Sequence, residues 1–204
     1  SLVAQTDNRI EIPIQSERDF FNVVNLGENG ALMLYGNARS SMSAVFYNKD
    51  LQQQWVNALQ TDPKSQFIES YANGAVVYLL FGNDNRRIFE VFRLSCNIGL
   101  IQHSVFNSLP NFEINQFKVN DEVVYLGGNI KKEPVILSIK LGNRTPRVIT
   151  GGFRERANLQ SIDFTPEGTI SASYILNKKR RNIIVVKEIE EFGLGVPAYR
   201  IEVF

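Results

Sequence analysis

The chain has 204 residues, of which 44% are hydrophobic and 21% charged, and its formal net charge is +1. These values are ordinary for a globular protein, and they exclude a global field that would steer the whole molecule to nucleic acid or to a membrane surface. A single cysteine excludes an intramolecular disulfide and a cysteine-based metal cluster. No apolar run approaches the roughly 18 residues that a membrane span needs.

The first residues of the chain carry two features. Residues 1–7 read SLVAQTD, and small and apolar residues that end at Ala4 are typical of the tail of a cleaved secretory signal. An ordinary chain terminus is the alternative. The first interpretation places the protein in the cell envelope, the periplasm or outside the cell. Residues 9–14, RIEIPI, predict a strand that completes or extends the last sheet of the fold.

A run of apolar residues that follows a turn and ends at an asparagine recurs along the rest of the chain. The asparagines recur every 46 to 48 residues and the preceding turns every 44 to 47. The asparagines are Asn37, Asn83, Asn129 and Asn177. Two landmarks therefore agree on a repeating unit of about 46 residues.

Each unit contains four short runs of strand-forming residues bounded by Gly, Asn, Asp or Pro. In chain order they span 20–26, 30–36, 42–48, 53–59, 66–71, 74–82, 87–94, 99–106, 113–119, 122–128, 134–141, 146–152, 159–164, 168–176, 182–189 and 198–204. Four short antiparallel strands per unit are typical of a β-propeller blade. We therefore expect an all-β fold, a single domain over 1–204 with about four four-stranded blades. The blades cover 20–60, 65–107, 111–153 and 158–204, and they form a complete small ring or part of a larger one.

The second and third strands of each unit differ in pattern. The second is a continuous apolar run, as in GAVVYLLFG, which predicts burial on both faces. The third alternates, as in IFEVFRL and VILSIKL, which predicts one face wetter than the other.

The segment GALMLYGNARSSMSAVFYNKDLQQQW resembles the repeat of bacterial β-propellers found in envelope and secreted proteins. Gly30, Gly36, residues 48–50 and Trp55 carry the match, and GGNIKKEPVILSIKLGN is a second, partial copy. The resemblance implies a scaffold for binding, and many members of that family have no enzymatic role.

Catalytic signals are weak. His103 is the only histidine and lies seven residues after Cys96, but nothing in the spacing supplies the third group that a Cys–His nucleophile needs. A zinc site would need two carboxylates from elsewhere in the chain, and no G-x-S-x-G elbow, P-loop or dinucleotide motif is present. We expect a partly buried strand histidine, a small buried thiol, and neither cofactor nor metal.

Polar residues recur in the first strand of each unit. The turns before the apolar runs contain Asn29, Asn73, Asn120 and Glu167. Counting back four positions from these residues gives Asn25, Glu69, Gln116 and Asp163. In a propeller the first strand is innermost, so these side chains are predicted to line the central channel. Two carboxylates and two amides could hold a hard cation or bind a sugar, and an ordinary wet channel wall is the alternative.

A second polar row lies three residues earlier in each first strand. It comprises Asn22, Gln66, Glu113 and Gln160. The two rows have opposite pleat parity, so without a bulge only one of them faces the channel.

The hairpin after each of the four apolar runs is basic. Together these hairpins contain Arg39, Arg86, Arg87, Lys131, Lys132, Lys178, Lys179, Arg180 and Arg181. In a propeller these hairpins emerge on one face, which we call the basic rim, whereas Glu28, Asp121, Glu122 and Glu167 are expected on the opposite face. A basic rim favours an acidic protein or an anionic glycan as partner, and solubility with protection of strand ends is the alternative.

The sequence therefore predicts a non-enzymatic binding or interaction module that recognises an acidic protein or an anionic glycan. Nucleic acid is disfavoured, because exposed aromatics are not interleaved with the basic residues. One alternative is a carbohydrate-active hydrolase or lyase with Glu69 and Asp163 as its carboxylate pair. Another is a structural subunit, including a homo-oligomer, that completes a larger propeller.

Overall fold

The computed structural model describes residues 19–37, 41–83, 85, 87–150, 157–178, 181–189 and 199–203. Of residues 19, 37, 41, 150, 177–178, 181–189 and 199–203 it describes the backbone alone. The segment 1–7 and the strand predicted over 9–14 lie outside the described residues, so both stay predictions.

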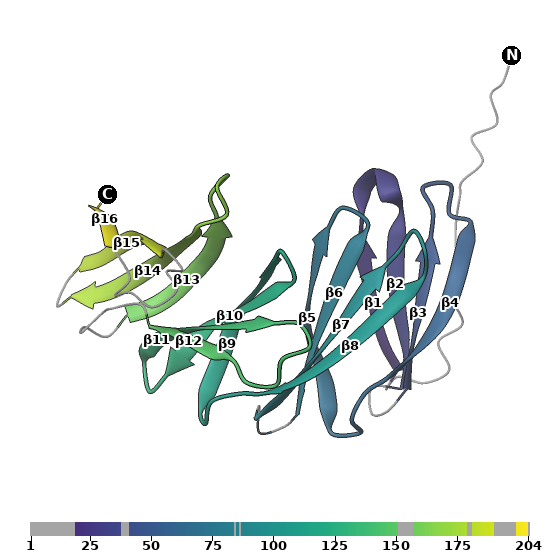
Figure 1. The fold of residues 1–204 in the computed structure, drawn as a ribbon, viewed down its shortest axis with the longest axis horizontal. Coiled ribbons are helices and arrows are strands. Elements are labelled where there is room, and N and C mark those ends of the chain that lie inside the picture. Colours follow the sequence, from purple (N-terminus) through teal and green to yellow (C-terminus); the bar gives the residue numbers. More distant parts are fainter. Residues whose placement is uncertain are drawn as a thin grey trace, which may run out of the picture. The chain divides into compact units, whose positions relative to one another are not determined.

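The described chain forms four antiparallel sheets of four strands each (Figure 1), and within every sheet the strands follow their order in the chain. The first sheet contains β1 (Asp19–Asn25), β2 (Ala31–Asn37), β3 (Ser41–Tyr47) and β4 (Gln53–Gln60). The second contains β5 (Ser65–Asn73), β6 (Val76–Asn83), β7 (Ile88–Ser95) and β8 (Leu100–Asn107). A short 3-10 helix, η1 (Gly27–Asn29), lies in the turn between β1 and β2.

The third sheet contains β9 (Phe112–Asn120), β10 (Val123–Ile130), β11 (Glu133–Lys140) and β12 (Arg147–Thr150). The fourth contains β13 (Ala157–Phe164), β14 (Ile170–Lys178), β15 (Arg181–Ile189) and β16 (Tyr199–Val203). Four consecutive up-and-down sheets of this kind are the blades of a β-propeller, so the predicted all-β propeller fold is confirmed. No helix among the described residues is long and apolar enough to span a membrane.

The described chain divides into two compact units. The first comprises residues 1–84 and 90–103, and the second comprises 85–89 and 104–204. In the first unit one apolar core joins the first and second sheets, with Leu32, Leu34, Leu79 and Phe81 almost fully buried. In the second unit another core joins the third and fourth sheets. It includes Ile136, Leu159, Ile162, Ala172 and Tyr174.

Burial along the strands corrects one expectation. The second strands β6 and β10 are buried on both faces, as predicted, with Val77 to Phe81 of β6 all in the core. In β14, by contrast, buried residues alternate with half-buried ones. Two of the third strands, β7 and β11, are not more exposed on one face: β7 is buried from Phe89 to Phe92 and β11 from Pro134 to Ile139. Both lie inside their sheets and carry packed neighbours on both faces, so it is the outer strands β4 and β8 that alternate with solvent.

Candidate functional site

The four residues of the predicted channel ring lie at two different levels of their strands. In the first unit Asn25 is the last residue of β1, whereas Glu69 lies four residues before the end of β5. In the second unit Gln116 lies four residues before the end of β9, and Asp163 is next to last in β13. The difference arises in the turns: β5 and β9 enter two-residue turns, and β1 and β13 enter five-residue turns.

Two of these residues have clear local roles. The Oδ1 atom of Asn25 accepts a hydrogen bond of 2.9 Å from the backbone nitrogen of Gly27, which fixes the turn after β1. The Nε2 atom of Gln116 donates to the carbonyl of Gln160 at 2.8 Å, so it ties β9 of the third sheet to β13 of the fourth. Glu69 and Asp163 are exposed. They belong to different units, and their pairing as catalytic carboxylates stays a prediction.

Bulges place both predicted polar rows on one face in two sheets. In β9 the register shifts at Asn115, so Glu113 opposes Asn129 and Gln116 opposes Gly127. Asn129 and Gly127 are two residues apart in β10, hence Glu113 and Gln116 share a face although they are three residues apart. The same shift in β5 brings Gln66 and Glu69 to one face. In β1 no shift occurs, and Asn22 and Asn25 lie on opposite faces.

The second unit contains the basic hairpins that the structure describes best. Lys131 and Lys132 form the two-residue turn between β10 and β11, both with positive φ (51° and 70°), and both are exposed. The turn points two cations outward because its backbone, like other tight hairpins, presents its central side chains to solvent. Arg87 is exposed just before β7 and belongs to the same unit.

The hairpin between β14 and β15 occupies the same place in the fourth sheet as the lysine turn does in the third. Its last paired residues are Lys178 and Arg181, whose backbones oppose each other. The other predicted rim residues, Arg39, Arg86, Lys179 and Arg180, lie outside the described residues. The described members of the rim in the second unit are therefore Arg87, Lys131, Lys132 and the backbones of Lys178 and Arg181.

The opposite end of the third sheet is mixed in charge rather than acidic. The turn after β9 carries Asp121 and Glu122, as expected. The turn after β11 lies beside it, because the backbone nitrogen of Leu141 donates to the carbonyl of Glu122 at 3.0 Å, and this turn is flanked by the exposed Lys140 and Arg144. Sequence reasoning overlooked these two cations because it counted only the turns after the first strands.

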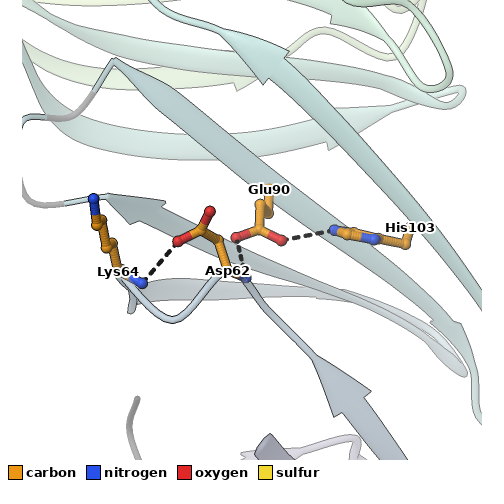
Figure 2. A network of polar contacts seen from close by, with 4 residues as sticks. All are labelled: Asp62, Lys64, Glu90 and His103. Atoms are coloured by element: carbon orange, nitrogen blue, oxygen red, sulfur yellow. Dashed lines mark hydrogen bonds and ion pairs between the residues drawn. The ribbon is translucent and has the colours of Figure 1, made fainter. Parts of the chain in front are cut away.

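A polar network in the first unit was not predicted. Figure 2 shows Glu90 between the ring of His103 and the backbone of Asp62. Glu90 is only 2% exposed, yet both of its oxygens are used: Oε2 lies 2.9 Å from Nε2 of His103, and Oε1 accepts from the Asp62 nitrogen at 3.1 Å. The His103 ring stacks on Phe92, with centroids 4.2 Å apart and planes within 5°.

This network connects three elements of the first unit. Asp62 also accepts a hydrogen bond from the Lys64 nitrogen at 2.8 Å, so it organises the segment between β4 and β5 (Figure 2). Glu90 lies on β7 and His103 on β8. The arrangement clamps the inter-sheet connection onto the second sheet. The one available signal was a glutamate inside the apolar run IFEVFRL, which the alternating pattern assigned to a wet face.

Cys96 is the buried thiol that the sequence predicts. It is fully buried, and this burial raises the pKa of its thiol to about 11. The neighbouring sheet reaches it through Trp55, whose Nε1 donates to the Cys96 carbonyl at 2.6 Å. His103 pairs with Glu90, so the structure does not bring the two residues together as a nucleophile and base. In the described part of the chain no three His, Cys, Asp or Glu side chains gather to hold a metal ion.

No protein-family model and no curated protein matches the sequence. Among solved structures similar to the chain is a GH43 β-1,3-galactosidase with galactodeoxynojirimycin, at 7% identity and a TM-score of 0.46, covering 91% of this chain and 78% of that one. A candidate 6-phosphogluconolactonase from Bacteroides fragilis has 10% identity and a TM-score of 0.48, covering 95% and 70%. Another, from Bacteroides uniformis, has 14% identity and a TM-score of 0.47, covering 92% and 69%. Likeness at this level says nothing of activity or ligand.

Proposed function

We propose that the protein is a non-enzymatic binding module that recognises an anionic glycan through the basic rim of its second unit. The observation that carries the proposal is the exposed lysine pair Lys131 and Lys132, held outward at the tip of the β10–β11 hairpin. The hairpin at the same place in the fourth sheet carries four consecutive basic residues, 178–181. Repeated cations at one topological position suit a polyanion with repeated charges.

The first test is a binding titration with a sulfated oligosaccharide, comparing two variants with the same change in net charge. The double variant Lys131→Glu/Lys132→Glu reverses the charge of the lysine turn in the rim. The double variant Lys140→Glu/Arg144→Glu reverses the charge of the two exposed cations at the other end of the third sheet. Because each exposed ion pair contributes well under 1 kcal/mol, we expect about tenfold weaker binding for the rim variant. The control should bind nearly as wild type.

Equal losses in the two variants would show that only net charge matters and would contradict a specific rim. The acidic-protein alternative is tested in the same assay with a polyglutamate peptide in place of the oligosaccharide. Preference for the peptide would replace the glycan in the proposal. We place the protein at the cell envelope or outside the cell, where anionic glycans are displayed, and cell fractionation tests that location.

A further inference from the structure

Two Asn–Gly dipeptides occur in the first unit, and both lie where the first strand of a sheet turns into the second. Asn29–Gly30 lies at the end of η1, and Asn73–Gly74 lies at the end of β5. An asparagine before a glycine can react with its own chain, because the glycine nitrogen reaches the side-chain carbon Cγ and no Cβ hinders its approach. The local structure decides whether each pair can do so.

The peptide between Asn29 and Gly30 is held from several sides. The Gly30 nitrogen donates to the Gly27 carbonyl at 3.0 Å, and the Gly30 carbonyl accepts from the Leu26 nitrogen at 2.9 Å. The side-chain amide of Asn29 donates to the Leu26 carbonyl at 3.4 Å. Gly30 is buried, and a side-chain carbon there would clash with the backbone oxygen of Tyr47. The Gly30 nitrogen can therefore attack Cγ of Asn29 only after these hydrogen bonds break.

Asn73 and Gly74 lie in an open turn. Asn73 pairs with Val76, so Gly74 and Ala75 form the two-residue turn between β5 and β6. The hydrogen bond of such a turn joins its first carbonyl to its fourth nitrogen, so it does not use the nitrogen of Gly74. Both Asn73 and Gly74 are exposed, and nothing lies within 4 Å of the place where a side chain on Gly74 would stand. The turn is anchored at its far side, where the Cys96 nitrogen donates to the Ala75 carbonyl at 2.8 Å.

We propose that Asn73 is a site of spontaneous deamidation, with water as the co-reactant. The Gly74 nitrogen loses its proton and attacks Cγ of Asn73, and the new C–N bond closes a five-membered succinimide ring. The C–N bond of the side-chain amide breaks, and the amide leaves with that proton as ammonia. Water then opens the ring at one of its two carbonyl carbons. Cleavage between the ring nitrogen and Cγ gives aspartate, and cleavage between the ring nitrogen and the backbone carbonyl carbon gives isoaspartate.

The reaction changes the end of the β5–β6 hairpin. Either product places a negative charge at the end of β5, and isoaspartate also adds one carbon to the backbone at the pair that closes the turn, Asn73 and Val76. Because the turn sets the register of a hairpin, the isoaspartyl form loosens the pairing next to it. The site belongs to the first unit and does not depend on the function proposed above.

The test is a time course of the full chain at mildly alkaline pH, folded in buffer and unfolded in urea, with peptide mapping by mass spectrometry and an isoaspartate assay. In the folded chain we expect Asn73 to convert at least about tenfold faster than Asn29, the factor that corresponds to about one backbone hydrogen bond. In urea the contacts around Gly30 are lost, so the two rates should become similar. The matched variant Asn73→Gln, which needs a six-membered ring, should stay unmodified at this position and leave the Asn29 rate unchanged.

Three outcomes would overturn the proposal. The first is a folded chain in which Asn73 stays intact while the same peptide converts in urea, which would show that the hairpin protects it. The second is conversion of Asn29 in the folded chain at the same rate or faster. The third is an undiminished preference for Asn73 in urea, because the neighbouring sequence and not the open turn would then select the site.

Discussion

Glu90 shows how one buried charge is accommodated in a propeller strand. Burying a carboxylate is unfavourable unless its oxygens are paired, and here a backbone N–H and an imidazole supply the partners. The sequence did not reveal this residue, because a glutamate within alternating apolar residues has the same pattern whether it faces solvent or a partner from another strand. Only the packing of β8 and of the segment before β5 decides between the two.

Removing one partner of Glu90 should therefore be more harmful than an ordinary surface change. We expect His103→Ala to lower the free energy of unfolding by about 1.5 to 3 kcal/mol, because it leaves a buried carboxylate with one partner fewer. Glu133→Ala, on an exposed carboxylate, should change it by less than about 0.5 kcal/mol. Urea denaturation of both variants measures the difference. Equal stabilities would show that the network does not clamp the connection before β5.

Cys96 gives a pH dependence whose sign can be stated. Burial raises the pKa of the thiol from 9.0 to about 11 in the folded chain, so the unfolded chain loses this proton first as pH rises. The stabilising contribution is complete below pH 9 and is lost between about pH 9 and 11, with a slope of at most about 1.4 kcal/mol per pH unit. Cys96→Ala should flatten this part of the stability curve. A curve of identical slope in wild type and variant would contradict the burial of the thiol.

At the scale of single elements, the sequence predicted all sixteen strands of the described residues to within a few residues, since short apolar runs between turn residues leave few alternatives. It did not predict the bulges of β5, β9 and β13. A bulge is one extra residue with no composition of its own, yet it reverses the pleat parity of everything before it. The pair Glu113 and Gln116 therefore shares a face, which the spacing alone had excluded for a regular strand.

Two adjacent glycines in β10 show how closely the bulged strand is packed. A side-chain carbon at Gly128 would clash with the backbone oxygen of Glu113, whereas one at Gly127 would meet the flexible ends of Leu159 and Ile162. We expect Gly128→Ala to destabilise the protein by about 2 kcal/mol or more, because backbone must move. Gly127→Ala should cost less, since side chains can rotate. Thermal unfolding compares the two, and the reverse order would contradict the described register.

At the scale of the whole molecule, the propeller fold was predicted from the sequence repeat. A unit of about 46 residues that occurs four times is compatible with little else than four small antiparallel sheets. The positions of functional residues were less predictable, because counting from turns assumes that all turns have one length. Asn25 and Asp163 precede five-residue turns and so lie nearer their strand ends than Glu69 and Gln116 do. The basic hairpins needed no such assumption, since a charged turn stays at the end of its strands.

We propose that the basic rim of the second unit binds an anionic glycan. The most direct measurement is salt-gradient elution from an immobilised sulfated polysaccharide, for wild type and for a variant with Lys131, Lys132, Lys178 and Arg181 changed to Glu. If the rim binds such a glycan, the wild type will be retained at low salt and will elute as salt screens the contacts, whereas the variant will not be retained. A wild type that passes through the column at low salt, or a variant retained equally well, would contradict it.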